Sequence, residues 1–390
     1  MSLARIALEG NMISISTLYC GRRLPSHRLR YGPSSEAGPV VVFNCTARCN
    51  LACAHCYSAS TAADPGDELS TPEARRLLDD LADAGTPVVL FSGGEPTLRE
   101  DLPDLIAHAT GAGIRAVISS NGTTITPAAA RRLADAGAAY VGVSIDGTEQ
   151  THDSFRGCTG SFAAAMAGID ACRHAGLKVG LRMTLTRRNA AQIEDVFGLL
   201  TAHEIPRVCF YHLVYAGRGA GLRGDDLSPD QRRDALDRIM GLAAAHEQVE
   251  VLTVDNHADG PYVYLRLLRE APARSPEALD LLRASRGNAS GVRLACVRPN
   301  GDVLPDQFSD GQRLGNVRDR PFGEIWTDGS SELLAALRRF PRQVTGRCGT
   351  CRWLEVCNAN LRARAEAATG DFWASDPSCQ LTDEEIHPPA

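Results

Sequence analysis

Short hydrophobic runs, many of them β-branched, alternate along the chain with longer stretches in which apolar positions recur at helical spacing. Six such runs cover residues 39–45, 88–94, 115–122, 140–147, 178–186 and 207–217. A run of this kind that is followed by a helix, several times over, predicts parallel strands joined by right-handed crossovers. We therefore expect an α/β fold, with a barrel and a doubly wound sheet both compatible with the pattern.

The unusual polar residues fall at the ends of these runs. Three cysteines follow the first run, Gly93–Pro96 follow the second, Ser120–Gly122 follow the third, and Ser144–Asp146 end the fourth. Arg182 lies on the fifth run, and the sixth ends in a polar and aromatic stretch from Tyr211. A parallel barrel collects its active site at the carboxyl ends of its strands. The pattern therefore favours a partial barrel.

The pattern changes after residue 216. Two helical stretches, around 230–247 and 262–272, flank a strand expected at 249–256. From residue 291 a hairpin is expected, with Asn300-Gly301 at its turn. We predict an N-terminal segment (1–39), a barrel (40–227), a helical connecting region (228–290) and a small cysteine-rich domain (291–390).

Composition narrows the class of protein. The chain has 390 residues, of which 44% are hydrophobic, enough for a sizeable core. A net charge of -6 argues against a nucleic-acid partner. No apolar run approaches membrane-spanning length and no signal peptide is recognisable, so we expect a cytoplasmic protein without a membrane partner.

Seven of the 13 cysteines form two local groups, which in a cytoplasmic protein favours metal binding over disulfides. The first group is Cys49, Cys53 and Cys56. Three thiolates can hold three irons of a [4Fe–4S] cluster and leave the fourth iron open to another ligand. A zinc site completed by His55 is the alternative.

The second group contains four cysteines, Cys348, Cys351, Cys357 and Cys379. Four thiolates suit zinc as well as an iron–sulfur cluster. The six remaining cysteines are expected to be buried structural thiols, with Cys296 as the exception, because it could deliver a hydrogen atom to a substrate radical.

The CxxxCxxC spacing, with Gly-Gly-Glu-Pro after the second strand, resembles the radical S-adenosylmethionine (radical SAM) superfamily. The resemblance implies a partial (β/α)6 radical SAM barrel. It also implies a [4Fe–4S] cluster on Cys49, Cys53 and Cys56, SAM bound to its open iron, and an electron donor such as flavodoxin or ferredoxin. Glycines let the backbone approach a ligand closely, and a carboxylate can hold the SAM ammonium group. The implied SAM-binding residues are Gly93, Gly94, Glu95, Ser120, Asn121, Ser144, Asp146, Arg156 and Arg182.

The C-terminal cysteines resemble the SPASM/twitch extension of radical SAM enzymes, which carries auxiliary [4Fe–4S] clusters. Full SPASM domains hold two clusters, whereas Cys348, Cys351, Cys357 and Cys379 provide ligands for one. Asp306 stands where many relatives have a cysteine, which fits a single auxiliary cluster.

Segments from Met12 to the C-terminal cysteines resemble the branch of the superfamily that modifies tetrapyrroles in haem and haem d1 biosynthesis. Chains of this branch typically start at the equivalent of Met12, so residues 1–11 are expected to be an extension. The implied reaction begins with a 5'-deoxyadenosyl radical and removes acetate side chains from 12,18-didecarboxysiroheme to give Fe-coproporphyrin III. Cys296, His212 and Tyr211 are the candidate catalytic residues. Other candidate contacts to the macrocycle or its carboxylates are Tyr215, Arg218, His257 and Tyr262.

One motif departs from this branch. Relatives usually read His-Pro-Asp-Gln-Phe-Trp where this chain has Leu304 and Ser309 at the two ends. Loss of the imidazole and the indole could remove contacts to the substrate or its iron. A radical SAM epimerase or dehydrogenase of an aminocyclitol or nucleoside, or a peptide-modifying enzyme, is therefore the alternative. A non-enzymatic iron–sulfur or zinc scaffold would not explain Gly-Gly-Glu-Pro or the polar strand ends.

Overall fold

The computed structural model describes residues 12–23, 38–63 and 65–387 and has a single mixed sheet at its centre. The 11 strands lie in the order β1-β8-β7-β6-β5-β4-β3-β2-β9-β10-β11. The strands are β1 (Met12–Ser14), β2 (Val40–Thr46), β3 (Val88–Gly93), β4 (Arg115–Ser120), β5 (Tyr140–Ser144), β6 (Val179–Leu185), β7 (Arg207–His212), β8 (Glu250–Val254), β9 (Leu294–Val297), β10 (Asp302–Leu304) and β11 (Gly315–Asn316).

Strands β2 to β8 are parallel and follow one another in chain order across the sheet. This is the partial barrel that the alternating pattern and the polar strand ends predicted. The run at 249–256, which we had placed in a connecting region, forms β8 and adds a seventh parallel strand beside β7. The buried runs are continuous because both faces of a parallel sheet are covered.

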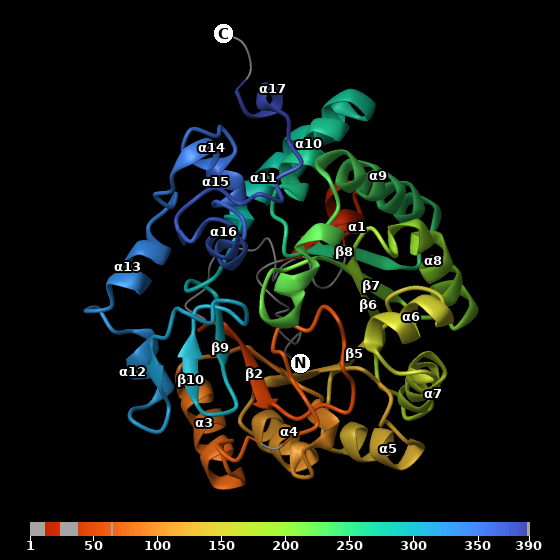
Figure 1. The fold of residues 1–390 in the computed structure, drawn as a ribbon, viewed down its shortest axis with the longest axis vertical. Coiled ribbons are helices and arrows are strands. Elements are labelled where there is room, and N and C mark those ends of the chain that lie inside the picture. The colour runs from red at the N-terminus through yellow and green to blue at the C-terminus, as the bar shows by residue number, and fades with distance from the viewer. Residues whose placement is uncertain (1–11, 24–37, 64, 388–390) are drawn as a thin grey trace.

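Helices surround the sheet and are spread around the rim of the molecule (Figure 1). They are α1 (Ile15–Leu18), α3 (Thr71–Asp83), α4 (Leu102–Gly111), α5 (Pro127–Asp135), α6 (Glu149–Arg156), α7 (Ser161–His174), α8 (Ile193–Ala202), α9 (Pro229–Ala245), α10 (Asp259–Glu270), α11 (Ser275–Ser285), α12 (Phe322–Trp326), α13 (Glu332–Arg338), α14 (Gly346–Gly349), α15 (Leu354–Cys357), α16 (Arg362–Thr369) and α17 (Asp383–Ile386). The 3-10 turns are η1 (Pro96–Leu98), η2 (Ala190–Gln192), η3 (Gly217–Asp225) and η4 (Pro272–Arg274).

Helix α3 illustrates how local sequence sets these elements. The Ser70 backbone N–H donates to the Glu73 carboxylate at 2.8 Å, which caps the first turn. Leu77, Leu78 and Leu81 are buried at helical spacing against the sheet. Short helix α6, which ends at Arg156 and was not anticipated, supplies a side chain to the site described below.

The C-terminal region continues the barrel sheet. Strand β9 pairs in parallel with β2, with Val40 opposite Leu294 and Phe43 opposite Val297, and β10 returns antiparallel as the expected hairpin. The predicted boundary at residue 291 therefore falls between strands of one sheet. Of the predicted N-terminal segment, residues 1–11 and 24–37 lie outside the described residues. The four-part division stays a prediction.

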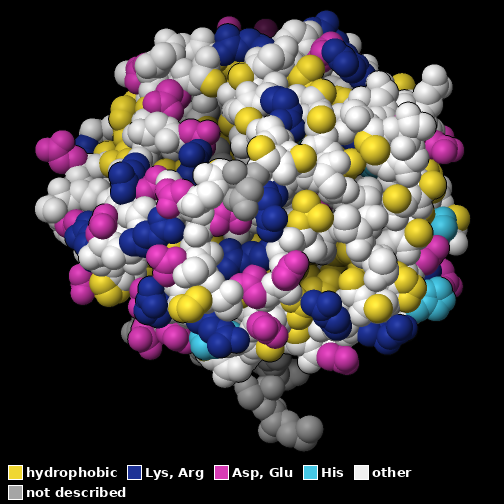
Figure 2. All heavy atoms as spheres, turned by 60° about the horizontal axis from the view of Figure 1, so that its bottom comes forward, with side chains coloured by type: hydrophobic (Ala, Val, Ile, Leu, Met, Phe, Trp, Pro, Cys, Tyr) yellow, Lys and Arg dark blue, Asp and Glu magenta, His cyan; other side chains and the backbone are white. Residues whose placement is uncertain are grey.

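The helices α12 to α16 lie beside β9 and β10 and extend to α10 and α11 (Figure 1). On the face shown in Figure 2, basic and acidic side chains are intermixed over the surface. Within the described ranges, no helix has both the length and the apolar character needed to cross a bilayer.

Candidate active site

A hollow opens at the carboxyl ends of the parallel strands, and its empty volume is about 1030 Å³ including the open mouth. Twelve of the residues predicted from sequence line it together. They are Cys49, Cys53, Cys56, Gly93, Gly94, Ser120, Asn121, Ser144, Arg156, Arg182, Tyr211 and His212. The hollow therefore combines thiols, small polar groups and an aromatic wall in one place.

The cysteine triplet lies in the loop after β2, with Cys49 and Cys53 buried and Cys56 half-buried. Two donors point at its sulfurs: Arg156 Nη1 lies 3.6 Å from Cys53 Sγ, and Asn121 Nδ2 lies 3.9 Å from Cys49 Sγ. Burial raises the pKa of Cys49 to about 11, and the charges of Glu95 and the two other cysteines raise it further. Three thiolates here need a strongly positive partner, as the irons of a cluster provide.

His55 lies within the same loop and lines the hollow. Its ring stacks on Phe155 with centroids 4.5 Å apart, and its Nε2 is 3.9 Å from the Asp146 carboxylate. Burial lowers the pKa of His55 to about 4, so the ring is neutral. Among the described residues, no three His, Cys, Asp or Glu side chains converge closely enough to hold one metal ion. A [4Fe–4S] cluster instead places each thiolate on a different iron, around a cavity.

Asp146 does not line the hollow, although we predicted it to bind SAM directly. It is fully buried, and its carboxylate pairs with Arg156 at 2.5 Å while accepting the Thr184 backbone N–H at 2.9 Å. Burial alone would raise the pKa of Asp146, but Arg156 lowers it below its ordinary value. We therefore assign Asp146 a positioning role: it holds the Arg156 guanidinium against Cys53.

Glu95 also lies outside the hollow. It is fully buried, and its Oε1 accepts hydrogen bonds from Ser120 Oγ at 2.8 Å and from the Thr97 hydroxyl at 2.6 Å. Oε1 also accepts the Thr97 backbone N–H at 3.1 Å, and Oε2 accepts the Asn121 backbone N–H at 2.7 Å. The carboxylate predicted to hold the SAM ammonium is thus committed to the ends of β3 and β4. We assign Glu95 to the support of the site.

Gly93 and Gly94 are required by close backbone packing. Gly93 has a φ of +120°, and a Cβ there would lie 2.3 Å from the Thr46 carbonyl oxygen. A Cβ on Gly94 would lie 2.0 Å from the Arg48 carbonyl oxygen, next to Cys49. The two glycines therefore keep the cysteine loop close to β3 and leave backbone groups facing the hollow.

Several predicted substrate residues do not reach the hollow. Arg218 donates to the carbonyl oxygens of Cys53 and Ser60, both at 2.8 Å, and so holds the cysteine loop. Tyr215 and Tyr262 donate to buried or half-buried aspartates, Asp226 at 2.7 Å and Asp237 at 2.8 Å. Their polar groups serve the fold in the structure.

Cys296 and His257 are also absent from the lining of the hollow. Cys296 is fully buried on β9, where Asn44 Nδ2 lies 3.6 Å from its sulfur. It faces Leu304 on β10, so the position where relatives carry an imidazole is occupied by a core side chain. Ser309 is buried and donates to Asp306 at 2.9 Å. The two departures from the relatives' motif are therefore structural residues here.

Several residues that line the hollow were not among the site residues predicted from the sequence, and some of these carry polar or aromatic groups. Among the latter are Tyr57, Ser92, Thr184, Asp255, Gln307 and Phe308. Asp255 follows β8. The expectation that active-site residues lie at the carboxyl ends of barrel strands would have identified Asp255 if β8 had been counted in the barrel. Phe308 packs edge-on against Tyr57 with ring centroids 5.3 Å apart, a contact between distant segments that no local signal predicts.

The four C-terminal cysteines line a second cavity, with an empty volume of about 430 Å³. Burial raises the pKa of Cys357 well above its usual value, and the charges of Cys348, Cys379 and Cys351 raise it further. Four thiolates so close together fit a cationic iron–sulfur core. Arg362 is fully buried nearby and donates to backbone carbonyls of Phe372, Ala374 and Ala359. No ion pair joins it to a carboxylate of the described residues; burial lowers the pKa of Arg362, while the charges of Asp376, Cys348 and Cys357 raise it.

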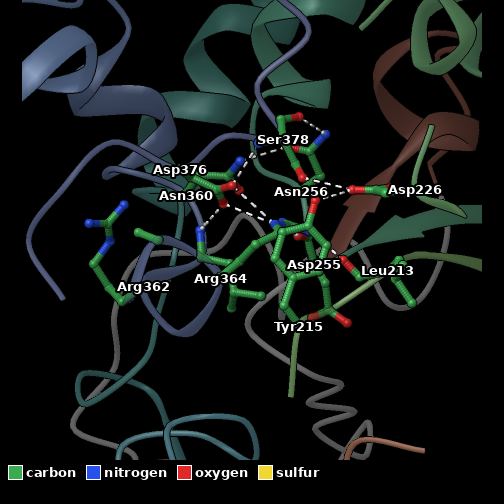
Figure 3. A network of polar contacts seen from close by, with 12 residues as sticks. Leu213, Tyr215, Asp226, Asp255, Asn256, Asn360, Arg362, Arg364, Asp376 and Ser378 are labelled. Atoms are coloured by element: carbon green, nitrogen blue, oxygen red, sulfur yellow. Dashed lines mark hydrogen bonds and ion pairs between the residues drawn. The ribbon is translucent and has the colours of Figure 1, made fainter. Parts of the chain in front are cut away.

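A buried polar network joins this second cavity to the hollow (Figure 3). Arg364 is fully buried and pairs with Asp376 at 3.0 Å. Its other nitrogens donate to the carbonyl oxygens of Leu213 at 3.0 Å and of Asp255, both of which line the hollow. The C-terminal region therefore fixes part of the active-site wall.

Comparison with known proteins agrees with this geometry. Residues 43–200 match the radical SAM superfamily, and residues 290–352 match an iron–sulfur cluster-binding domain named SPASM. The chain is 50% identical over 394 residues to the Fe-coproporphyrin III synthase of Methanosarcina barkeri, covering 96% of this chain and 99% of that protein. It is 41% identical over 353 residues to the pre-heme d1 synthase of Dinoroseobacter shibae, covering 89% and 87%.

Solved structures show the same fold at low sequence identity. Native anSMEcpe with bound AdoMet has a TM-score of 0.67 at 18% identity, covering 88% of this chain and 94% of that chain. Streptococcus suis SuiB bound to S-adenosylmethionine has a TM-score of 0.70 at 17% identity, covering 89% and 78%. The chain belongs to the radical SAM superfamily, as an enzyme that uses a [4Fe–4S] cluster and SAM and carries a SPASM iron–sulfur domain.

Proposed function

We propose that this enzyme modifies an iron tetrapyrrole by removing the acetate side chains of 12,18-didecarboxysiroheme to give Fe-coproporphyrin III. The observation that carries the proposal is the 50% identity to an Fe-coproporphyrin III synthase across nearly the whole length of both chains. Leu304 and Ser309, the two departures from the relatives' motif, do not line the hollow and so supply no contact to a ligand there.

The composition of the hollow supports a large, flat, anionic substrate. Phe308 and Val214 form an apolar wall that also contacts Leu361. The Arg182 guanidinium lies over the Tyr211 ring, 4.7 Å from its centroid, and offers a cation beside an aromatic face. A macrocycle needs both, since its ring is apolar and its side chains end in carboxylates.

We assign the cofactors to the residues as follows. Cys49, Cys53 and Cys56 hold the [4Fe–4S] cluster, and Gly93, Gly94, Ser120, Asn121, Ser144 and Arg182 contact SAM. When bound, the cluster and SAM supply the radical that takes a hydrogen atom from the substrate. Arg156 neutralises thiolate charge at Cys53, held in place by Asp146. Cys348, Cys351, Cys357 and Cys379 hold one auxiliary [4Fe–4S] cluster.

Iron content tests the cluster assignment. Anaerobically reconstituted protein should hold two [4Fe–4S] clusters, about eight irons per chain. Replacing Cys49, Cys53 and Cys56 together with alanine should leave about four. An unchanged iron content in this variant, or stoichiometric zinc in the C-terminal site, would contradict the assignment.

Titration with didecarboxysiroheme tests the substrate. Binding should shift the Soret band, and with SAM and a reductant the enzyme should release Fe-coproporphyrin III and two acetates while 5'-deoxyadenosine accumulates. If there is neither a spectral shift nor a substrate-dependent rise in 5'-deoxyadenosine, the enzyme acts on another molecule, such as an aminocyclitol, a nucleoside or a peptide.

A further inference from the structure

His212, at the end of β7, is paired with a buried carboxylate in the wall of the hollow. Its Nε2 lies 2.8 Å from Asp259 Oδ2, and both residues are buried, with 3% of the His212 side chain exposed. Within the described part of the chain, Asp259 is the sole hydrogen-bond partner of this ring. The other ring nitrogen, Nδ1, is therefore the one available to a ligand in the hollow.

The pairing fixes which nitrogen carries the proton. Burial alone would raise the pKa of Asp259, but His212 lowers it below its ordinary value, so the carboxylate is ionised and can only accept. Nε2 must then donate to the carboxylate, so Nδ1 is the ring nitrogen whose lone pair can serve a ligand. A histidine whose second nitrogen donates to a carboxylate is the usual arrangement for metal ligation, because the carboxylate sets the tautomer and increases the basicity of the ligating nitrogen.

Asp259 is itself held from the C-terminal region. Its Oδ1 accepts from Asn256 Nδ2 at 3.1 Å and from Gln380 Nε2 at 2.9 Å. Asn256 Nδ2 also donates to Gln380 Oε1 at 2.9 Å, and Asn360 Nδ2 donates to Asn256 Oδ1 at 2.6 Å. Asn256 and Asn360 belong to the network in Figure 3. The imidazole is thus oriented by several buried amides, which is more than a packing role requires.

His55 is the other histidine among the described residues that line the hollow. It lies between Cys53 and Cys56 in sequence and stacks on Phe155 at 4.5 Å, so it belongs to the cysteine loop. His212 lies instead beside Tyr211 and Val214, on the wall that suits a macrocycle. The hollow therefore offers one imidazole to a substrate iron.

We propose that Nδ1 of His212 is the axial protein ligand of the iron in the tetrapyrrole substrate, with Asp259 as its positioning residue. This inference rests on the proposed function, since it requires an iron tetrapyrrole. The ligand would hold the macrocycle by its centre and fix which edge faces SAM. Ligation of the iron by His212 would also make the enzyme bind iron tetrapyrroles in preference to metal-free ones.

The test is a titration of the reconstituted holoenzyme with Fe-coproporphyrin III and, in parallel, with metal-free coproporphyrin III. In the wild type, the ferrous complex should show an iron–histidine stretching band in resonance Raman spectra. His212→Gln should lose the band and weaken binding of the iron macrocycle at least tenfold, while binding of the metal-free macrocycle is unchanged. Added imidazole should restore a band in His212→Gly. Asp259→Asn should weaken iron-macrocycle binding about tenfold.

His257→Gln is the matched control, since His257 is buried close to Asp259 in sequence but does not line the hollow. Iron content close to wild type shows that each variant is folded. A band that persists in His212→Gln overturns the inference while the proposed function stands. Equal loss of both macrocycles also overturns it, because His212 would then be a packing residue. If the wild type binds neither Fe-coproporphyrin III nor didecarboxysiroheme, the proposed function fails and the inference fails with it.

Discussion

Replacement of Glu95 tests whether its carboxylate binds SAM directly or supports the ends of β3 and β4. Sequence alone assigns its carboxylate to the SAM ammonium group, so Glu95→Ala would weaken SAM binding by about 1.5–3 kcal/mol. In the structure the carboxylate is fully buried and accepts bonds from Thr97, Ser120 and Asn121. The main effect of the same substitution should therefore be on the free energy of unfolding.

The magnitude follows from the donors that lose their acceptor. The Asn121 backbone N–H is buried, and leaving such a group unsatisfied costs about 1–3 kcal/mol. The Thr97 N–H is half-buried and adds less, and the two hydroxyls can rotate to other acceptors. Burial raises the pKa of Glu95 despite its hydrogen bonds, so removal of the charge offsets part of the loss. We expect Glu95→Ala to lower the free energy of unfolding by about 2–4 kcal/mol.

The assay is urea unfolding of the anaerobic holoenzyme together with SAM binding by calorimetry at low temperature, where the variant is folded. Glu100→Ala, at an exposed position five residues along from Glu95, is the matched control and should change neither quantity. If Glu95→Ala unfolds at the wild-type urea concentration yet loses SAM affinity more than tenfold, the carboxylate holds SAM directly and the reasoning from the structure is refuted.

Three further predictions concern the supports of the two cavities. Gly94→Ala should push the cysteine loop away from β3 and lower the iron content of the first cluster. Gly198→Ala is the control, because its added Cβ meets nothing within 4 Å, and it should leave the iron content unchanged. Equal iron contents in the two variants would contradict the prediction. Burial lowers the pKa of His152 to about 4. As the pH falls below about 6.5, this histidine is therefore protonated in the unfolded chain before it is protonated in the folded one. Its contribution to the free energy of unfolding should drop by about 3 kcal/mol between pH 6.5 and 4. His152→Gln should remove this contribution to the pH dependence of the free energy of unfolding, measured by urea titration at each pH. The same pH dependence in the variant and the wild type would refute the prediction. Arg362→Met removes a buried positive charge beside the C-terminal thiolates and should make the auxiliary cluster harder to reduce, as a more negative midpoint in an EPR-monitored redox titration; a shift to a more positive potential would be inconsistent with that charge arrangement.

Sequence predicted the barrel and the position of the site because both depend on local patterns. Hydrophobic runs mark the strands, and the strand-end rule places Cys49, Gly93 and Arg182 around one hollow. Residue type, however, does not tell which way a side chain points. Glu95, Asp146 and Arg218 have the chemistry of ligand-binding groups, yet each is turned toward the backbone or the side chains that hold the site.

Contacts between distant segments account for the rest. Nothing near Asn256 in the sequence indicates that it meets Asn360 and Gln380. The same holds for Phe308, which reaches the hollow because β9 and β10 extend the barrel sheet. Such pairings depend on the whole fold, so local periodicity carries no signal for them.

The pairing of β9 with β2 has a consequence for how the protein is made. One edge of β2 is covered by β3 soon after both are synthesised, but the other edge waits for Leu294–Val297, roughly 250 residues later. At about 5–20 residues per second, that interval lasts on the order of 10–50 seconds. During it the unpaired edge of this largely apolar strand is open to pairing with other chains. Nascent chains that stall before β9 should therefore be prone to aggregation and in need of chaperones, however stable the finished enzyme is.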